Sequence, residues 1–193
     1  MIDNKYGQIS GGWLDGCEQI VSPNCEARPC GARVELVVVH NISLPPGKFG
    51  GPYIADLFSN CLDPKAHPYF EEIADLRVSA HFLIHRDGEV IQFVSTQDMA
   101  WHAGVSKWRG REKCNEFSIG IELEGTDTHL YTQEQYARLA EIIQKCRAAH
   151  PALEEDAIVG HSDIAPGRKT DPGESFDWRA LQSRLGIGSL PRG

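Results

Sequence analysis

The sequence predicts a single α/β domain in which helices cover a mixed β-sheet. Strand-like and helix-like segments are interleaved along the chain, an order typical of this class. At least one pair of neighbouring strands has the pattern of a hairpin, which makes part of the sheet antiparallel. The length of 193 residues suits one sizeable core and leaves too little chain for a second domain. We therefore expect one domain over residues 1–193, with its core at 8–185 and an exposed tail at 186–193.

Two stretches in the first half of the chain carry clear strand signals. Residues 32–41, ARVELVVVHN, form a run rich in β-branched side chains and predict a buried strand that ends at His40. Residues 80–95, AHFLIHRDGEVIQFVS, alternate in polarity on both sides of Asp87-Gly88, the dipeptide that type I′ hairpin turns favour. These residues therefore predict two antiparallel strands.

A third strand signal carries two carboxylates. In residues 117–125, FSIGIELEG, the apolar side chains of Ile119, Ile121 and Leu123 point to one face. Glu122 and Glu124 point to the other face. This strand is therefore expected to bury one side and to present acidic groups on the other.

The clearest helix signal lies in residues 131–150. Thr132 can cap the first turn and Gln135 completes a capping box, while apolar residues recur at helical spacing behind them. Weaker signals predict shorter helices at 54–60, 67–76 and 176–185. A Pro- and Gly-rich loop precedes the first of these, and the region 42–77 is a candidate gate for a site.

Residues 160–173, GHSDIAPGRKTDPG, gather charged residues among three Gly and two Pro. Such a stretch cannot form a regular helix or a central strand, so we expect an ordered loop that leaves a short strand at 157–159. Residues two apart in an extended loop face the same side, so Lys169 and Asp171 can reach one site together.

Composition limits the classes of partner. The chain has 27 acidic and 19 basic residues, a formal charge of −8, which argues against a nucleic-acid partner. No apolar stretch approaches the roughly 20 residues of a membrane-spanning helix, and the N-terminus lacks the pattern of a secretory signal. The six cysteines show no C-x-x-C spacing, so we expect mostly free thiols and a cytoplasmic protein.

Three residues have the chemistry of a catalytic zinc site. Two imidazoles and one carboxylate, here His40, His161 and Asp171, are a typical ligand set that leaves a fourth position for water. Glu122 could then move a proton and Lys169 could stabilise an oxyanion. Each residue also has a structural interpretation. In that interpretation His40 only ends a buried strand, His161 caps a turn and Asp171 opens one. Glu122 is then a solvated carboxylate and Lys169 a surface charge. Because the chain has eight histidines, spacing alone leaves both interpretations open.

Five segments together resemble a known family. They are VVVHNISLPPGKFGG, RVSAHFLIHRDGEVIQFV, AWHAGVS, FSIGIELEGTD and VGHSDIAPGRKTDPG, in this order. The combination resembles the zinc-dependent N-acetylmuramoyl-L-alanine amidases, most closely the cytoplasmic members that recycle anhydro-muropeptides. The likeness spans about residues 8–185. The wider superfamily includes phage amidases and peptidoglycan recognition proteins.

The resemblance implies a role for each matching residue. His40, His161 and Asp171 correspond to the ligands of one zinc ion per chain, Glu122 to the general base and Lys169 to the cation that stabilises the transition state. The implied reaction is hydrolysis of the amide between the lactyl group of 1,6-anhydro-N-acetylmuramic acid and L-alanine. The implied partner is a small-molecule muropeptide, and we expect a monomer that binds neither nucleic acid nor membrane.

Four further residues correspond to substrate contacts. Asn41 resembles a residue that holds the peptide, Trp101 an aromatic wall beside the sugar, and Arg77 a partner for a stem-peptide carboxylate. Lys113 occupies a place where relatives are expected to carry Arg, and it keeps the charge without the bidentate geometry. Trp101 as plain core and Arg77 as a helix-end surface charge are the structural alternatives.

Two other functions belong to the same superfamily. One is an amidase that cleaves intact peptidoglycan outside the cytoplasm, which the missing signal argues against. The other is a binding module that has lost a zinc ligand. The three ligand positions are all filled here, which favours catalysis.

Overall fold

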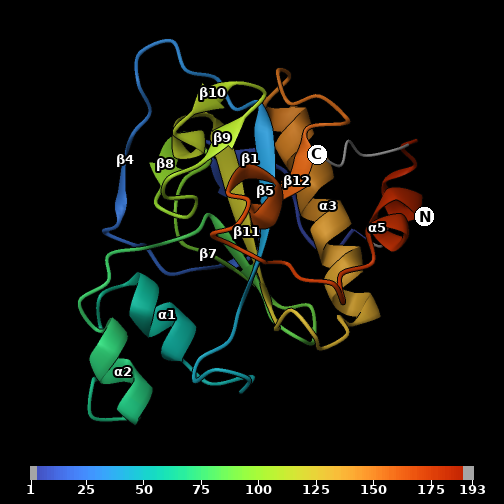
Figure 1. Cartoon of the computed structure of the whole chain (residues 1–193). Helices are drawn as coiled ribbons and strands as arrows, with labels where there is room; N and C mark the ends of the chain where they lie inside the picture. The colour runs from blue at the N-terminus through green and yellow to red at the C-terminus, as the bar shows by residue number, and fades with distance from the viewer. Residues whose placement is uncertain (1–3, 189–193) are drawn as a thin grey trace.

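A six-stranded mixed sheet forms the centre of the structure, a computed structural model that describes residues 4–188 (Figure 1). Its strand order is β12 (Ile158–Gly160), β5 (Leu36–Ile42), β11 (Ser118–Glu124), β6 (Phe82–Ile84), β7 (Val90–Gln92) and β3 (Glu18–Gln19). The first four strands are parallel, β6 and β7 form the predicted antiparallel hairpin, and β3 runs parallel to β7. The predicted class, a mixed sheet with helices around it, is confirmed.

The two long strands β5 and β11 lie side by side in the middle of the sheet. Every residue of β11 is buried, as are Leu36 to His40 of β5, because neighbouring elements cover both faces. Their parallel register pairs Glu122 with His40. The alternation of β11 is as predicted: its apolar side chains join the core cluster that also contains the residues of the long helix.

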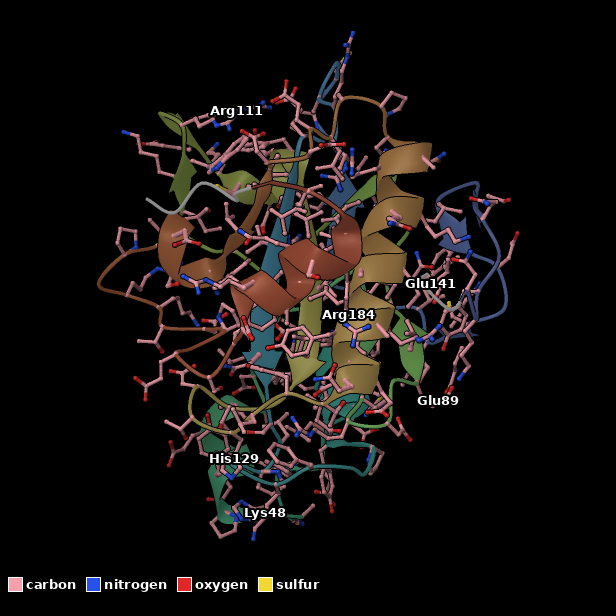
Figure 2. The ribbon with its side chains drawn as sticks, turned by 90° about the vertical axis from the view of Figure 1, so that its right-hand side faces the viewer. Lys48, Glu89, Arg111, His129, Glu141 and Arg184 are labelled. Carbon is pink, nitrogen blue, oxygen red and sulfur yellow. The ribbon has the colours of Figure 1, made fainter. Side chains whose placement is uncertain are left out.

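Helices α3 (Gln133–Ala149) and α5 (Trp178–Leu185) cover one face of the sheet (Figure 2). The predicted capping box of α3 is present, since Thr132 Oγ1 accepts from Gln135 N and Gln135 Oε1 accepts from Thr132 N. Arg184 of α5 donates to Gln133 of α3 and ties the two helices together. Amphipathic helices of this kind are stabilised mainly by the apolar face that they bury.

Helices α1 (Tyr53–Phe58) and α2 (Pro68–Ile73) lie together at one end of the molecule, away from α3 (Figure 1). Their buried side chains, among them Leu57 and Phe70, form a second apolar cluster with Leu83 of β6. Lys48 and His129 project at this end as well (Figure 2). The two helices and the loop before them therefore border the sheet at one end rather than on a face.

Three short ribbons and a 3₁₀ helix complete the described elements. The ribbons are β1 (Ile9–Ser10) with β2 (Trp13–Leu14), β4 (Cys25–Ala27) with β8 (Asp98–Ala100), and β9 (Lys107–Trp108) with β10 (Arg111–Glu112); the 3₁₀ helix is η1 (Cys114–Phe117). None of these elements was predicted from the sequence. Strands of two or three residues show no period by themselves; β6 and β7 are as short, but the Asp87-Gly88 turn between them gave a second signal.

Two segments that carry site residues differ from the prediction. β5 continues past His40 to Ile42, because Asn41 and Ile42 still pair with β11. The expected loop at 160–173 begins with one helical turn, α4 (His161–Ile164), in which the Asp163 carboxylate accepts from Gly160 N. The Asp163 carboxylate thereby satisfies a backbone amide that would have no partner at the start of the helix, which offsets the unfavourable helix propensity of Gly160.

The predicted tail at 186–193 lies partly outside the described residues. Gly186 ends α5 with φ of 69°, a conformation that glycine adopts without steric cost. Ile187 is half-buried against the core, so the first part of the segment is packed rather than fully exposed.

All six cysteines are free thiols. Cys114 and Cys146 are buried, and Cys30 and Cys61 are exposed. None of the helices in residues 4–188 has the length and apolar character that a membrane crossing requires.

Candidate metal centre

The three predicted ligands meet beside the ends of two neighbouring strands. His40 lies in β5, His161 directly follows β12, and Asp171 lies on the loop beyond α4. Each pair among His40 Nδ1, His161 Nδ1 and Asp171 Oδ2 is 3.0 Å apart. β12 pairs parallel to β5, so both strands end at the same edge of the sheet. That pairing brings residues 121 positions apart in the chain into contact.

The spacing of these three atoms fits one small ion. Imidazole nitrogens and carboxylate oxygens bind Zn²⁺ at about 2.0–2.2 Å, and two such atoms at a tetrahedral angle stand about 3.3 Å apart. Within the described part of the chain, this is the one group of ligating side chains whose donor atoms all lie within 4.8 Å of one another. Both histidines are buried and the carboxylate is partly exposed.

The contact that His161 Nε2 makes with the backbone indicates which ring nitrogen of His161 can bind a metal. His161 Nε2 lies 3.0 Å from Ala103 O, a carbonyl that can only accept. The neutral imidazole therefore carries its proton on Nε2 and presents a lone pair at Nδ1. This tautomer points the free pair at His40 and Asp171, as a ligand requires.

The charges of His40 and Asp171 agree with a cation site. Burial lowers the pKa of His40 to about 4, which keeps its imidazole neutral. Burial raises the pKa of Asp171, but the hydrogen bonds with His161 and His40 outweigh that effect and hold the pKa below its usual range. Two neutral imidazoles and an ionised carboxylate are the protonation states in which these groups ligate.

Glu122 lies on the strand beside His40 and is buried rather than solvated. Its Oε2 is inaccessible to solvent and has no hydrogen-bond partner among residues 4–188. Burial, followed by the nearby charge of Asp171, raises the pKa of this carboxyl well above its usual range, while Lys169 lowers it. A buried carboxyl whose pKa is raised in this way suits general acid–base work.

Lys169 reaches the same site from the loop. It lines a cavity of about 370 Å³ together with His40, Glu122, His161 and Asp171. No ion pair or hydrogen bond of its ammonium is found within the described residues, so its charge is not neutralised by a surface carboxylate. The expectation that Lys169 and Asp171 reach one site together is met by this cavity.

Trp101 and Asn41 also line this cavity. Trp101 is half-buried, and its backbone N donates to Ser79 Oγ at 3.0 Å. Asn41 Nδ2 donates to Asp127 Oδ1 at 2.8 Å and to Pro172 O at 3.1 Å. The amide of Asn41 therefore fixes the loop that carries Asp171, in addition to bordering the cavity.

Arg77 and Lys113 lie outside this cavity. Arg77 is exposed and donates to the carbonyls of Ala74 and Leu76 at the end of α2. Lys113 lines a separate cavity of about 630 Å³, and its Nζ lies 3.8 Å from Glu116 Oε1. Contact of either side chain with a substrate remains a prediction.

His102, which was not predicted from the sequence as a site residue, also lines the metal-site cavity. His102 Nδ1 lies 2.9 Å from His40 Nε2, the nitrogen of His40 that faces away from the other ligands. Burial and the neighbouring imidazole of His40 keep the pKa of His102 well below its usual range. The signal was present in the segment AWHAGVS, where His102 directly follows Trp101.

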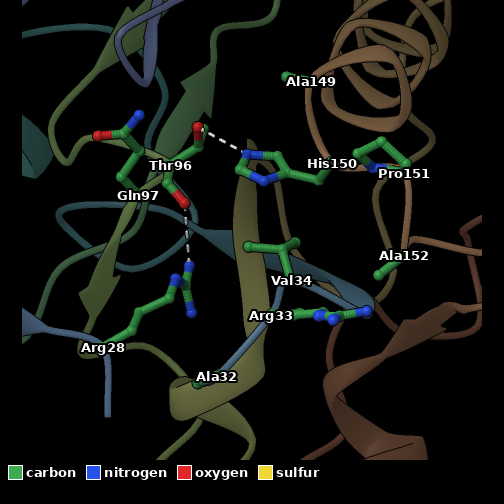
Figure 3. A pocket seen from close by; sticks show the side chains of 10 residues that line it. All are labelled: Arg28, Ala32, Arg33, Val34, Thr96, Gln97, Ala149, His150, Pro151 and Ala152. Carbon is green, nitrogen blue, oxygen red and sulfur yellow. Dashed lines mark hydrogen bonds between the residues drawn. The ribbon is translucent and has the colours of Figure 1, made fainter. Parts of the chain in front are cut away.

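A further cavity, of about 540 Å³, contains none of these residues (Figure 3). Arg28 donates to Thr96 O on one wall, and His150 Nε2 lies 2.9 Å from Thr96 Oγ1. The guanidinium of Arg28 also donates to the backbone carbonyls of Asn115, Glu116 and Ser118. Its hydrogen bonds therefore hold backbone segments together around the cavity.

Comparison with known proteins relates this arrangement to peptidoglycan amidases. The chain is 57% identical over 167 residues to the 1,6-anhydro-N-acetylmuramyl-L-alanine amidase AmpD of Escherichia coli, covering 86% of this chain and 91% of that protein. It superposes on the crystal structure of a selenomethionine derivative of AmpD with a TM-score of 0.90, 53% identity and coverage of 93% and 99%.

A more distant structure contains a bound substrate. This is the N-acetylmuramyl-L-alanine amidase AmiD of E. coli in complex with anhydro-N-acetylmuramic acid-L-Ala-D-γ-Glu-L-Lys, with a TM-score of 0.60, 27% identity and coverage of 85% of this chain and 62% of AmiD. The sequence profile of the Amidase_2 family, N-acetylmuramoyl-L-alanine amidases, matches residues 31–174, which include all three candidate ligands. The chain therefore belongs to the Amidase_2 family of N-acetylmuramoyl-L-alanine amidases.

Proposed function

We propose that this protein is a zinc-dependent amidase that hydrolyses the amide between the lactyl group of 1,6-anhydro-N-acetylmuramic acid and L-alanine in recycled muropeptides. The observation that carries the proposal is the triangle of His40, His161 and Asp171 donor atoms, 3.0 Å apart, on a cavity that Glu122 and Lys169 also line. The names of the AmpD relatives and the AmiD substrate complex support the same reaction.

In this proposal His40, His161 and Asp171 hold one zinc ion per chain. When bound in a site with three protein ligands, zinc supplies a Lewis acid that activates water and polarises a carbonyl. The two histidines keep their outer nitrogens bonded to the protein, which orients the rings. Asp171 is oriented by its loop, which Asn41 ties to β5 through Pro172 O.

Glu122 moves the proton of the reaction. Glu122 lines the cavity in which the attacking water would lie, and no donor within the described residues competes for its Oε2. The carboxylate accepts a proton from the attacking water and then delivers it to the departing amine of L-alanine. A raised pKa suits the second step, because the protonated acid must persist until the C–N bond breaks.

Lys169 acts where negative charge develops. When water attacks the lactyl carbonyl, the carbonyl oxygen becomes an oxyanion, and an ammonium nearby stabilises that charge. Trp101 lies on the wall of the same cavity and is assigned to the sugar. Asn41 borders the peptide side, and Arg77 and Lys113 are assigned to carboxylates of the stem peptide at the periphery.

We further propose that residues 1–193 form one amidase domain that works as a monomer in the cytoplasm. Six free thiols suit a reducing compartment. A muropeptide is a soluble small molecule, so this proposal requires no polymer or membrane partner.

The test is metal content measured together with product release. Purified protein should carry about one zinc per chain, as a site with three protein ligands predicts, and should release the stem peptide from an anhydro-muropeptide. A chelator should abolish the activity and zinc should restore it. Full hydrolysis by protein shown to be metal-free would refute the mechanism, and faster cleavage of intact sacculi would favour a cell-wall amidase instead.

A further inference from the structure

We infer that His102 is a positioning residue for the metal: its Nδ1 accepts the proton of His40 Nε2 and so holds His40 in the tautomer that presents Nδ1 to the ion. The inference rests on the proposed zinc site and concerns a residue outside the ligand set. His102 contacts a ligand, not the ion, and it acts through that ligand.

Two adjacent residues, His102 and Ala103, contact the ring nitrogens of the two histidine ligands that face away from the metal site. His161 Nε2 donates to Ala103 O, and His40 Nε2 lies 2.9 Å from His102 Nδ1. A carbonyl can only accept, so the tautomer of His161 is fixed by the backbone. An imidazole nitrogen accepts only when it carries no proton, so the tautomer of His40 depends on where His102 keeps its own proton.

Ser118 lies at the far end of a series of hydrogen bonds that runs from His40 through His102. His102 Nε2 lies 3.1 Å from Ser118 Oγ. A neutral imidazole carries one proton, and when that proton sits on Nε2 and is donated to Ser118, Nδ1 is free to accept from His40. The opposite direction, with the hydroxyl as donor, would place the proton of His40 on Nδ1. That atom faces His161 and Asp171, so only the first direction leaves three lone pairs for an ion.

Gly120 makes the space in which the His102 ring lies. A Cβ built on Gly120 would stand 2.4 Å from His102 Cγ and 2.6 Å from Cδ2 and Nδ1, closer than such atoms approach. The φ of Gly120 is not in the left-handed region, so the backbone conformation does not require glycine here. The missing side chain is what allows the imidazole to lie against β11.

The backbone of residues 102 and 103 is also held in place. Asn115 Oδ1 accepts from His102 N at 3.2 Å and from Ala103 N at 2.8 Å. His81 packs edge-on against the His102 ring with 5.9 Å between ring centroids, and its Nδ1 accepts from Gly120 N. Hydrogen bonds therefore fix the position of the acceptors for both histidine ligands.

A partner on the outer nitrogen of a metal-bound histidine orients the ring and raises its basicity. Loss of such a partner typically weakens metal affinity by about 10- to 100-fold. A residue that only fills space would not have this effect, since a side chain of similar volume could replace it. Metal affinity in the absence of substrate therefore separates the two roles.

The experiment measures the zinc dissociation constant of the purified protein by competition with a chromophoric chelator. His102→Phe keeps a ring but removes the acceptor, and Gly120→Ala displaces an intact His102. Both should weaken zinc binding by about 10- to 100-fold. His102→Asn places an amide oxygen near the position of Nδ1 and should restore affinity to within about threefold of the parent, well inside that range. His150→Phe removes a half-buried imidazole that bonds Thr96 Oγ1, and as the control it should leave the constant unchanged.

Zinc affinity of His102→Phe within about threefold of the parent overturns the inference, because it lies outside the range for a lost partner. The same holds if His102→Asn binds no better than His102→Phe while the two metal-free proteins melt at the same temperature. If His102→Phe does not fold, Gly120→Ala and His102→Asn decide in the same way. A parent protein that binds no zinc refutes the proposed function itself, whereas tight binding by every variant refutes only the role of His102.

Discussion

Replacing Glu122 by Gln isolates the proton-carrying role of this carboxyl. The substitution keeps the shape of the side chain and removes its ability to take a proton. The structure gives Oε2 no donor among residues 4–188 and no solvent, so the amide displaces no existing hydrogen bond at that atom. Zinc should stay at the parental level, because Glu122 is not one of the three atoms in the triangle.

The expected loss is kinetic. A general base contributes about 10²- to 10⁴-fold, which corresponds to about 2.7–5.4 kcal/mol of barrier at 1.36 kcal/mol per factor of ten. The thermal stability should not decrease together with the rate. A buried carboxylate without a partner is unfavourable, so the neutral amide should leave the melting temperature of the metal-free protein unchanged or higher.

Glu124 provides the matched control, since it lies on the same face of β11 and is also buried. Its carboxylate accepts from Gly50 N and Arg86 N and lies 3.4 Å from His85 Nδ1. Glu124→Gln should therefore lower the melting temperature and leave zinc binding intact. The assays are peptide release from an anhydro-muropeptide, zinc per chain and thermal unfolding. Loss of zinc in Glu122→Gln would make Glu122 a ligand, and an unchanged rate would remove it from the mechanism.

Three other perturbations test separate parts of the structure. Lys169→Ala should reduce kcat and kcat/KM alike by about 10²- to 10³-fold with near-normal zinc, and a kcat within about threefold of the parent would exclude the oxyanion role. Thr132→Ala removes the cap of α3 and should lower the free energy of unfolding by about 1 kcal/mol in a denaturant titration; no change would mean that the cap does not stabilise the fold. The hydrogen bond with Glu124 raises the pKa of His85, so its stabilisation is complete below about pH 6.5 and is lost as the pH rises through the higher folded pKa. The difference in melting temperature between parent and His85→Gln should therefore shrink from pH 6 to pH 9, and a constant difference would contradict this.

Patterns that lie within one segment were predictable from the sequence. The capping box of α3, the hairpin at Asp87-Gly88 and the alternation of β11 all depend on residues a few positions apart. The short ribbons were not predicted, because two or three residues show no period by themselves and no further sequence signal was recognised beside them. The helical turn at His161 was missed because the preceding glycine argues against a helix. In the folded chain the Asp163 carboxylate accepts from Gly160 N and offsets that destabilising effect.

The environment of each site residue depended on distant contacts instead. Alternation places Glu122 and Glu124 on the same face and cannot distinguish them. Only the folded chain brings donors from the loops at Gly50 and Arg86 to Glu124 and none to Glu122 Oε2. In the same way, nothing near His102 in the sequence indicates that Gly120 leaves space for its ring.

The pairing of β5 with β11 connects stability with the proposed chemistry. Ile119, Ile121 and Leu123 must face the cluster beneath α3 to be buried, and the pleat then turns Glu122 to the opposite face. The parallel register sets Glu122 beside His40 on that face. A slip of one residue would carry the apolar side chains out of the core and turn the carboxyl toward it, so the alternative register is strongly disfavoured. The apolar residues of β11 therefore stabilise the fold and, by the same constraint, place the proton carrier beside a metal ligand.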